Sequence, residues 1–542
     1  MAVTQITSTS IKRHISPLDT SYALNAAHTK RLRRDNVANE DIQSKPSSFS
    51  HSGIKPSGNL LFNHSSSIRR RGLGSFDVLS DSLILGIIGL LDARDILLLG
   101  SCSKASFAYC AHQPIWKDLY IRTANGRLDG WAGTWRKTYL QEFTSTGTPR
   151  KGGDRCMRLT PTIDCTGLFS DELYQPYLCA NTDLNRYFYP RNNRDAVSRL
   201  NMTRIEAKSI ANEFASSSSE PFVVTNALEH LGWPAFCSVD SEGKPLWDTS
   251  NLLKKYSDIS FRAEAFDCTL RTYWTYAENC PEDDAPLYLF DSRFVEKTEM
   301  GADYTPPSFL SEDLFQLMGD KRPDYRWLIV GPAKSGSTFH KDPNATSAWN
   351  AVITGSKGWV MFPPDVLPPG VYVSSDEAEV TSPLSLAEWF MSYFDNAWST
   401  YGRGTGKMRV GVCRAGEIVY VPSGWWHLVV NLEPSVAVTQ NFASEHELVN
   451  VLRFMRDKPD QTSGWAEDIA CADLYEIFCD VLRKERPENL ENALAVLNKG
   501  SRKGNGEQQS VWEQLKKPTL PEGVDNGFSF GFEVEGSNDD EE

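Results

Sequence analysis

Between residues 221 and 445 the sequence repeats one pattern, in which a short run of β-branched and aromatic residues ends at a glycine or proline. The clearest runs are PFVVTNAL, LYLFDSRF, YRWLIVG, AWNAVITG, GWVMFPP, EIVYVPSG, HLVVNL and SVAVTQNFA. Runs of this length are too short for ordinary helices, and the frequent turns allow neighbouring runs to pair as strands. The pattern predicts a mainly β domain, built as a barrel or a double-sheet jelly roll.

Residues 76–122 have a helical period instead. A leucine or isoleucine recurs every four residues, at Leu79, Leu83, Ile87 and Leu91. This spacing predicts a helix that uses these side chains as its apolar face. Asp95 is expected to cap a second short helix, and Pro114 to open a third. Three short helices give only a thin core, so we expect a partner or the following domain to cover them.

The remaining segments divide the 542 residues further. RNNRDAVSRLNMTRIEAKSIANEF predicts a helix that leads into the strand PFVVTNAL, and residues after 445 return to helical patterns. The expected organisation begins with a disordered basic tail (1–72), a small all-α domain (73–125) and a linking helical region (126–215). The β domain (216–445), C-terminal helices (446–500) and a disordered acidic tail (501–542) follow.

Charge and cysteine content limit the classes of function. The net charge is -14, which does not indicate direct nucleic-acid binding, although residues 1–72 carry 11 Lys/Arg against 4 Asp/Glu. The 11 cysteines contain no C-x-x-C pair, and no secretory signal or bilayer-length apolar run is present. We therefore expect an intracellular protein without a membrane segment. The basic clusters at 30–35 and 69–71 predict import into the nucleus, with a solvated basic tail in the cytoplasm as the alternative.

The stretch STFHKDPN places a histidine and an aspartate two residues apart. In a strand, His340 and Asp342 share one face while Lys341 points to the other. Five histidines lie beyond residue 72, and His427 is the best candidate for a third ligand because it follows GEIVYVPSGWW and enters another strand. Two histidines and one carboxylate leave coordination positions open, which is typical of non-haem Fe(II) oxygenases.

From APLYLFDS to NFAS, over roughly 160 residues, the chain resembles the Jumonji-C family of 2-oxoglutarate oxygenases. The resemblance is closest to the subgroup named for the lysyl hydroxylase once called the phosphatidylserine receptor. The motifs that carry it are PLYLFDS, SGSTFHKDPNATSAWNAVITGSKGWVMFP and GEIVYVPSGWWHLVVNLEPSVAVTQNFAS. The resemblance implies a double-stranded β-helix, which is a jelly-roll or cupin-like fold.

The resemblance also assigns roles to individual residues. It implies that Fe(II) is held by His340, Asp342 and His427. It implies that the co-substrate 2-oxoglutarate, which reacts together with O2, is contacted by Lys357, Thr439, Asn350, Tyr288 and Ser337. A lysine within apolar strands needs an anion beside it, and the distal carboxylate of 2-oxoglutarate would meet that need.

Two reactions are compatible with this site: hydroxylation of a lysine side chain, and demethylation of methyl-lysine or methyl-arginine. The resemblance implies a basic protein substrate, such as a histone tail or another Lys/Arg-rich protein. Glu278, Glu282, Asp283 and Asp284 precede PLYLFDS and either form an acidic rim for such a substrate or belong to a solvated loop.

Residues 76–122 resemble an F-box, through the Leu-rich first helix, the DARDILLLGSCSKASFAYC middle and the closing PIWKDLY. Ser80 stands where that family usually has proline. The resemblance implies binding to the Skp adaptor of a cullin–RING ubiquitin ligase. The alternative function is therefore a substrate receptor of such a ligase, with the Jumonji-C fold used for recognition.

Overall fold

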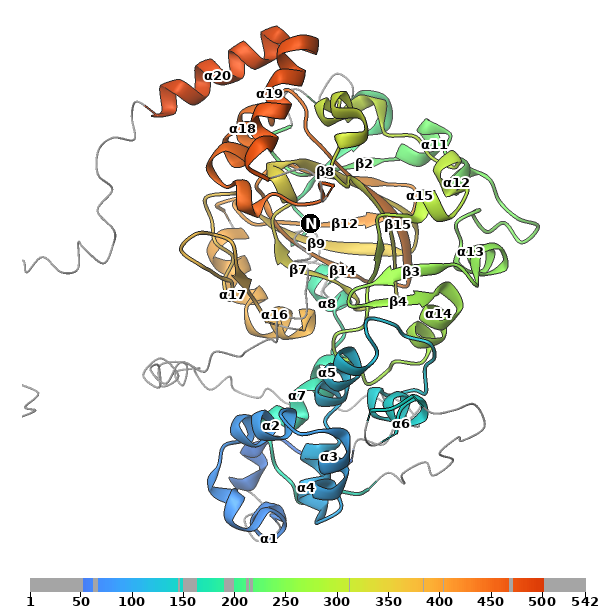
Figure 1. Ribbon diagram of the computed structural model, residues 1–542, viewed down its shortest axis with the longest axis vertical. Helices are drawn as coiled ribbons and strands as arrows, with labels where there is room; N and C mark the ends of the chain where they lie inside the picture. Colours follow the sequence, from blue (N-terminus) through green and yellow to red (C-terminus); the bar gives the residue numbers. More distant parts are fainter. Residues whose placement is uncertain are drawn as a thin grey trace, which may run out of the picture. The chain divides into compact units, whose positions relative to one another are not determined.

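The computed structural model describes residues 52–61, 67–144, 147–149, 163–189, 199–210, 214, 218–310, 312–383, 385–402, 404–466 and 471–501. The chain divides into two compact units, one up to Leu490 and one from Glu491. The first unit contains the β domain and the helices before it (Figure 1). The second contains most of helix α20, Pro487–Ser501.

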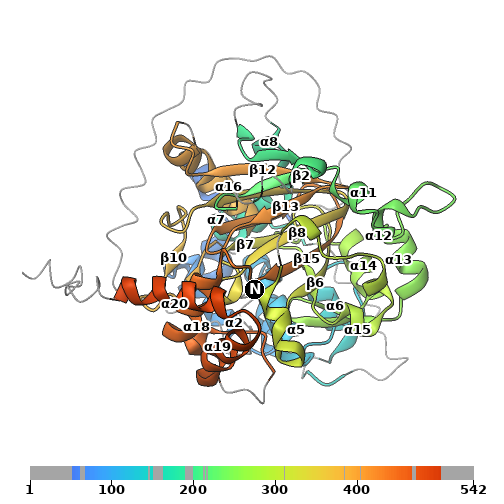
Figure 2. The same ribbon diagram turned by 90° about the horizontal axis from the view of Figure 1, so that it is seen from above.

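Two sheets form the centre of the first unit, and Figures 1 and 2 show them facing each other. The larger has the strand order β1-β2-β13-β8-β15-β6-β5-β3-β4 and the smaller β12-β9-β14-β7. The strands towards the edges include β3 (Ser260–Ala263), β4 (Phe266–Thr269), β5 (Leu289–Asp291) and β12 (Arg409–Arg414). The strands that build the site are β6 (Arg326–Gly331), β7 (Gly336–His340), β8 (Ser347–Thr354), β9 (Ser356–Phe362), β13 (Ile418–Val421), β14 (Trp426–Asn431) and β15 (Ser435–Phe442). Neighbouring strands among these are antiparallel. The predicted jelly-roll, cupin-like architecture is confirmed.

Alternation along these strands separates an inner from an outer face. Side chains of both sheets, among them Val352, Val419, Met361 and Val429, pack into one cluster between the sheets. Burial of both faces explains why the strands read as continuous apolar runs. The interior is narrow, so the few polar side chains that point into it are forced close together.

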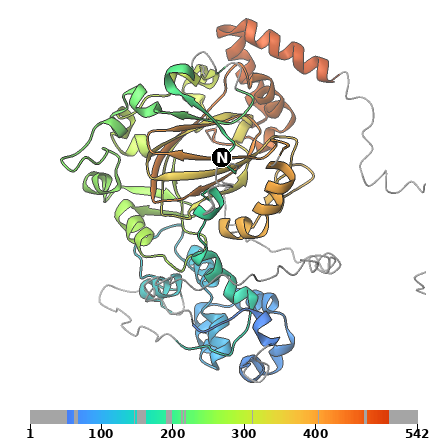
Figure 3. The same cartoon turned by 180° about the vertical axis from the view of Figure 1, so that it is seen from behind.

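Helices cover the outer faces of both sheets. The outer face of the small sheet packs on α16 (Leu386–Ser392) and α17 (Phe394–Ala397) through a cluster that includes Phe339, Trp389 and Phe390. The outer face of the large sheet packs on several helices, including α14, Leu270–Glu278. Figure 3 shows the same arrangement from behind.

The N-terminal helices, which we call the helical module (residues 69–142), precede the sheets. Its main members are α2 (Asp81–Gly89), α3 (Ala93–Gly100), α4 (Lys104–Cys110), α5 (Gln113–Thr123) and α6 (Trp135–Glu142). Pro114 lies in the first turn of α5, as predicted. The hydrophobic core of the helical module continues into the core beneath the large sheet, so the β domain covers part of it.

Two details of the helical module differ from the sequence predictions. Helix α2 buries Ile84, Leu85 and Ile88, whereas Leu83 and Ile87 of the predicted stripe are 46% and 44% exposed. The helix is apolar on more than one side, so periodicity alone could not select the buried face. Helix α3 is capped by Asp92, whose side chain accepts from the Asp95 N–H, and not by Asp95.

The prediction of a disordered segment up to residue 72 was wrong for the residues that the structure describes. Residues 57–61 form a 3-10 helix and Arg69–Leu73 form α1. Arg69 bonds Asp77 and Asp81 through its guanidinium, at 2.8 and 3.1 Å. These partners lie further along the chain, which is why composition alone misplaced the boundary. Residues 1–51, including the cluster at 30–35, and residues 502–542 lie outside the described residues.

The helix predicted ahead of PFVVTNAL is interrupted by a strand. Strand β1, Thr203–Glu206, pairs in parallel with β2, Phe222–Thr225. The helices predicted after residue 445 include α18 (Leu448–Asp457) and α19 (Leu474–Glu485). Among the described residues, no single helix is both long and apolar enough to cross a bilayer; one pair, Arg69–Val78 with Asp81–Gly89, passes that test jointly but is bent by 83°.

Candidate active site

The three predicted metal ligands meet between the sheets. His340 ends β7 and is directly opposite His427 on β14, with ring centroids 4.1 Å apart. Asp342 follows β7 at the start of a 3-10 turn, and one of its carboxylate oxygens is 4.0 Å from His427 Nε2. One ligand atom from each of the three residues lies within 4.8 Å of the others. The fold therefore brings these three side chains together from two distant segments of the sequence, as predicted.

The hydrogen bonds of this group leave its metal-binding atoms free. His340 Nδ1 is 2.7 Å from the carbonyl oxygen of Thr338, and His427 Nδ1 is 3.1 Å from that of Trp425. As donors in these bonds, the Nδ1–H groups leave a lone pair on each Nε2, the usual arrangement of metal-binding histidines. Buried His340 Nε2 and Asp342 Oδ2 have no protein partner. Burial, and then the nearby His427, hold the pKa of His340 well below its usual range, so its ring stays neutral and able to bind a metal.

Lys341, between the first two ligands, is turned away from them. Its ammonium lies 4.8 Å from the centre of the Trp426 ring, a cation–π contact. The tryptophans beside the third ligand, Trp425 and Trp426, are 6% and 5% exposed, while His427 is 3% exposed. Trp425 packs in the cluster between the sheets, and Trp426 packs in the cluster on the outer face of the small sheet.

Lys357 is fully buried on β9, and the partners of its ammonium are neutral. Its Nζ donates to the Tyr288 hydroxyl and to Asn431 Oδ1, both at 2.7 Å. Burial lowers the pKa of Lys357 from 10.5 to about 7. A buried lysine held only by neutral groups is suited to an anionic ligand, because a carboxylate would restore its charge.

Close packing on one side of this lysine depends on a glycine. A Cβ added at Gly331, the last residue of β6, would lie 2.6 Å from Asn431 Nδ2 and 2.8 Å from a ring carbon of Tyr288. Any side chain there would displace one of the two partners of Lys357. Glycine at this position allows both partners to reach the ammonium.

The other predicted co-substrate residues share one pocket with the metal ligands. Tyr288, Ser337, Asn350 and Thr439 all line it, while Lys357 lies behind Tyr288 rather than on the pocket surface. Thr439 donates its hydroxyl to the Trp349 carbonyl at 2.7 Å, so its oxygen remains available as an acceptor. Buried Asn350 Oδ1 has no protein partner.

Two asparagines in the site were not assigned a role from the sequence. Asn431 lies four residues after His427 on β14, and its Nδ2 donates to Ser335 Oγ at 2.9 Å. Alternation along the strand places it on the same face as the ligand, and this signal could have identified it. Asn441, two residues after Thr439, is bonded to Thr346 Oγ1 while its own Oδ1 has no partner.

The acidic segment before PLYLFDS has a structural role. Asp283 accepts from Trp135 Nε1 at 3.0 Å and from the Tyr276 hydroxyl at 2.7 Å. Glu278 accepts from Trp274 Nε1 at 2.8 Å. These carboxylates are bonded to side chains of α14 and α6. Asp283, at least, is therefore not available to form an acidic rim for a basic substrate.

A jelly roll that encloses two histidines and an aspartate beside a buried lysine defines the class of 2-oxoglutarate- and iron-dependent oxygenases. The comparisons with known proteins agree. A family model described as a cupin-like domain matches residues 307–447. The arginine-specific demethylase JMJ22 of Arabidopsis thaliana is 37% identical over 475 residues, which are 86% of this chain and 88% of that protein.

Other relatives match a smaller share of the chain. The bifunctional arginine demethylase and lysyl-hydroxylase psr-1 of Caenorhabditis elegans is 30% identical over 55% of this chain and 71% of its own length. The human 2-oxoglutarate and iron-dependent oxygenase JMJD4 is 27% identical over 43% of this chain and 58% of its own length. The chain belongs to this Jumonji-C, cupin-like family, and it is an Fe(II)- and 2-oxoglutarate-dependent dioxygenase.

The lowered pKa of Lys357 predicts that co-substrate binding takes up a proton. Between pH 7 and 10.5 the unfolded chain keeps this proton while the folded protein without ligand loses it, so the contribution of Lys357 to stability rises with pH across that window. A bound carboxylate raises the pKa again. At pH 8.5 we expect uptake of about one proton per 2-oxoglutarate bound. Calorimetry in buffers of different ionisation enthalpy measures this number, and binding without proton uptake would contradict the lowered pKa.

Proposed function

We propose that this protein oxidises arginine or lysine side chains of basic proteins, histone tails among them. The observation that carries the proposal is the cluster of His340, Asp342 and His427, in which His340 Nε2 and Asp342 Oδ2 have no partner, in the same fold as Lys357, a buried lysine with neutral partners. The iron and 2-oxoglutarate supply the oxidising chemistry when bound. The chain's own residues bind them, orient them and exclude water.

The choice of substrate rests on the relatives. One relative that covers most of the chain is named an arginine-specific demethylase, and another is named both an arginine demethylase and a lysyl-hydroxylase. We propose N-methyl-arginine as the first substrate class and unmodified lysine as the second. Both reactions begin at a C–H bond placed beside the same metal, so the ligand set does not distinguish them.

The test uses the full chain with Fe(II), 2-oxoglutarate, O2 and matched Lys/Arg-rich peptides, with and without methyl groups on arginine. We expect succinate formation that depends on the peptide, and a peptide lighter by one CH2 unit. A peptide heavier by one oxygen atom on lysine would assign hydroxylation instead. Succinate without any change in either peptide would reject both substrate classes.

A second function, adaptor binding, is supported by an exposed apolar surface on the helical module. Its side chains are between 44% and 87% exposed and comprise Phe76, Val78, Leu83, Ile87, Leu90 and Leu98. A surface of this kind is typical of a protein interface. We propose that it binds the Skp adaptor of a cullin–RING ligase, as the F-box resemblance implies, so that the helical module would deliver substrates to the ligase.

Charge introduced into this surface should strongly weaken adaptor binding without affecting catalysis. We expect the double variant Leu83→Glu, Ile87→Glu to bind the Skp adaptor at least about thirtyfold more weakly, because two apolar anchors become charged. Its melting temperature and its turnover should equal those of the wild type. The matched control is Val239→Glu, another exposed apolar residue, 59% exposed and outside the helical module. Equal adaptor binding by both variants, or none by the wild type, would reject this function.

We propose a nuclear location, supported by the basic cluster at residues 30–35. The cluster at 69–71 is less suited to an import receptor, because Arg69 is engaged by two aspartates. Replacing the basic residues of 30–35 with alanine should shift the full-length protein to the cytoplasm, as imaged in cells. An unchanged distribution would reject the signal.

A further inference from the structure

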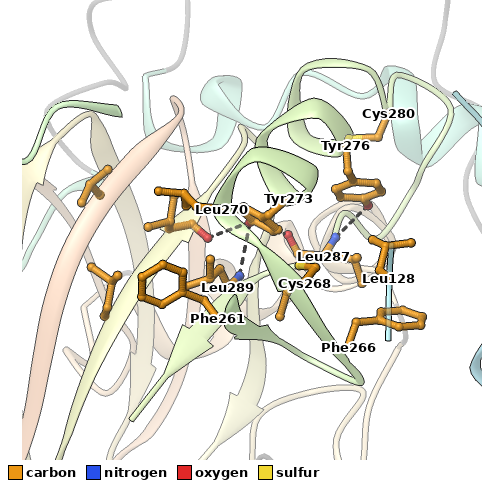
Figure 4. Packing of buried hydrophobic residues seen from close by; sticks show 14 of the residues in the cluster. Leu128, Phe261, Phe266, Cys268, Leu270, Tyr273, Tyr276, Cys280, Leu287 and Leu289 are labelled. Carbon is orange, nitrogen blue, oxygen red and sulfur yellow. Dashed lines mark hydrogen bonds between the residues drawn. The ribbon is translucent and has the colours of Figure 1, made fainter. Parts of the chain in front are cut away.

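The backbone on either side of Tyr288 is held by a neighbouring helix. Helix α14 carries two fully buried tyrosines less than one turn apart, Tyr273 and Tyr276. Figure 4 shows both hydroxyls pointing at the segment from Leu287 to Leu289. Tyr288, at the centre of that segment, bonds the ammonium of Lys357.

Three consecutive backbone N–H groups of this segment are bound by side chains. The Leu287 N–H donates to the Tyr276 hydroxyl at 2.8 Å and the Leu289 N–H to the Tyr273 hydroxyl at 3.2 Å. Between them, the Tyr288 N–H donates to Glu264 Oε1 at 3.1 Å. A strand normally bonds its amides to a neighbouring strand. Of these three residues only Leu289 belongs to a strand, where it pairs with Ala263 and Val330, and side chains bond all three amides.

Each tyrosine hydroxyl also has an acceptor for its own proton. The Tyr273 hydroxyl lies 2.7 Å from the Val330 carbonyl of β6 and 2.9 Å from the Leu287 carbonyl, and Tyr276 donates to Asp283 Oδ2 at 2.7 Å. Asp283 Oδ2 in turn accepts from Trp135 Nε1 of α6 at 3.0 Å. A continuous series of contacts therefore links the helical module to the hydroxyl that meets Lys357.

We propose that Tyr273 and Tyr276 are positioning residues for the co-substrate: they set where the Tyr288 hydroxyl lies, and through it the ammonium of Lys357. Neither tyrosine lines the pocket, and the hydroxyl of each bonds the backbone of residues 287–289 instead. The contact between Trp135 and Asp283 makes the helical module part of this support. The inference rests on the assignment of Tyr288 and Lys357 to 2-oxoglutarate.

The alternative explanation is that these hydroxyls only stabilise the fold. The matched control is a buried tyrosine whose hydroxyl is bonded within the helical module, away from residues 287–289. Tyr109 is fully buried, and its hydroxyl bonds Asp81 at 2.6 Å and Arg69 at 3.2 Å. Tyr109→Phe thus removes one bonded hydroxyl, as Tyr276→Phe does, without touching the segment that carries Tyr288.

The experiment measures the dissociation constant of 2-oxoglutarate by calorimetry on the Fe(II)-loaded protein without oxygen, together with its KM in turnover. We expect Tyr276→Phe to weaken 2-oxoglutarate binding about fivefold, because the Leu287 N–H and Asp283 both lose the hydroxyl that they bond. Iron affinity and the KM for the peptide should not change. Tyr109→Phe should lower the melting temperature about as much as Tyr276→Phe does, and it should leave 2-oxoglutarate binding unchanged.

A double-mutant cycle shows whether Tyr276 acts through Tyr288. We expect Tyr288→Phe to weaken 2-oxoglutarate binding about tenfold, and the double variant with Tyr276→Phe to bind no more weakly than Tyr288→Phe alone. Additive losses, or no loss in Tyr276→Phe while Tyr288→Phe is impaired, would overturn the positioning role and leave the site assignment intact. No loss in Tyr288→Phe would instead overturn the assignment of Tyr288.

Discussion

Asp342→Ala should abolish turnover and iron binding while leaving the fold intact. Asp342 supplies the only carboxylate of the cluster that could hold the metal. Substitution of groups that merely orient metal ligands already costs 10- to 100-fold, so loss of a ligand should lower turnover by more than about a hundredfold. The fold should tolerate the change, because one Asp342 carboxylate oxygen is buried without a hydrogen-bond partner.

The measurement is Fe(II) binding without oxygen, followed by calorimetry and by the melting temperature. Iron should raise the melting temperature of the wild type and not that of Asp342→Ala, because only a ligand that binds the folded state stabilises it. The control is Asp460→Ala, an exposed aspartate in a 3-10 helix far along the sequence from the cluster. Undiminished iron affinity in Asp342→Ala would show that the metal is held elsewhere.

Lys357→Met should have opposite effects on co-substrate binding and on stability. Without lysine, the distal carboxylate of 2-oxoglutarate would be buried without a countercharge. Loss of one partner of a buried charge pair costs about 2–5 kcal/mol, so binding should weaken by about a hundredfold or more. Below pH 7 and without ligand, the free energy of unfolding of the variant should be no lower than that of the wild type. The reason is that the variant no longer buries an ammonium, whose pKa in the wild type is lowered by burial to about 7.

Two measurements on one preparation test this: 2-oxoglutarate binding and denaturant unfolding across the pH range. The pH dependence that Lys357 gives to stability above pH 7 should disappear in the variant. The control is Lys334→Met, a partly buried lysine whose pKa burial also lowers and whose ammonium bonds the Ala180 carbonyl. A variant that retains 2-oxoglutarate affinity would show that Lys357 does not receive the carboxylate.

Wherever the chemistry is local, the sequence predicted the structure well. His340 and Asp342 lie together and Lys341 points away, as predicted, although Asp342 is an extended residue just beyond the end of β7 rather than part of the strand. Alternation along β14 puts His427 and Asn431, four residues apart, on one face of the strand. Helix α2 is apolar on more than one side, so its periodicity does not show which face is buried. The predicted stripe through Leu83 and Ile87 is exposed.

By itself the sequence predicted the strand-rich class, the helices around it and the pair His340 and Asp342, because these follow from residue types at fixed spacing. His427 followed from its setting before a strand and from the family resemblance. Only the tertiary structure decided which partners satisfy the buried polar groups. Tyr288 and Asn431, which lie 69 and 74 residues from Lys357 in the sequence, hold its ammonium in place of a carboxylate. Their meeting depends on how the sheets close around a narrow interior, which no local pattern encodes.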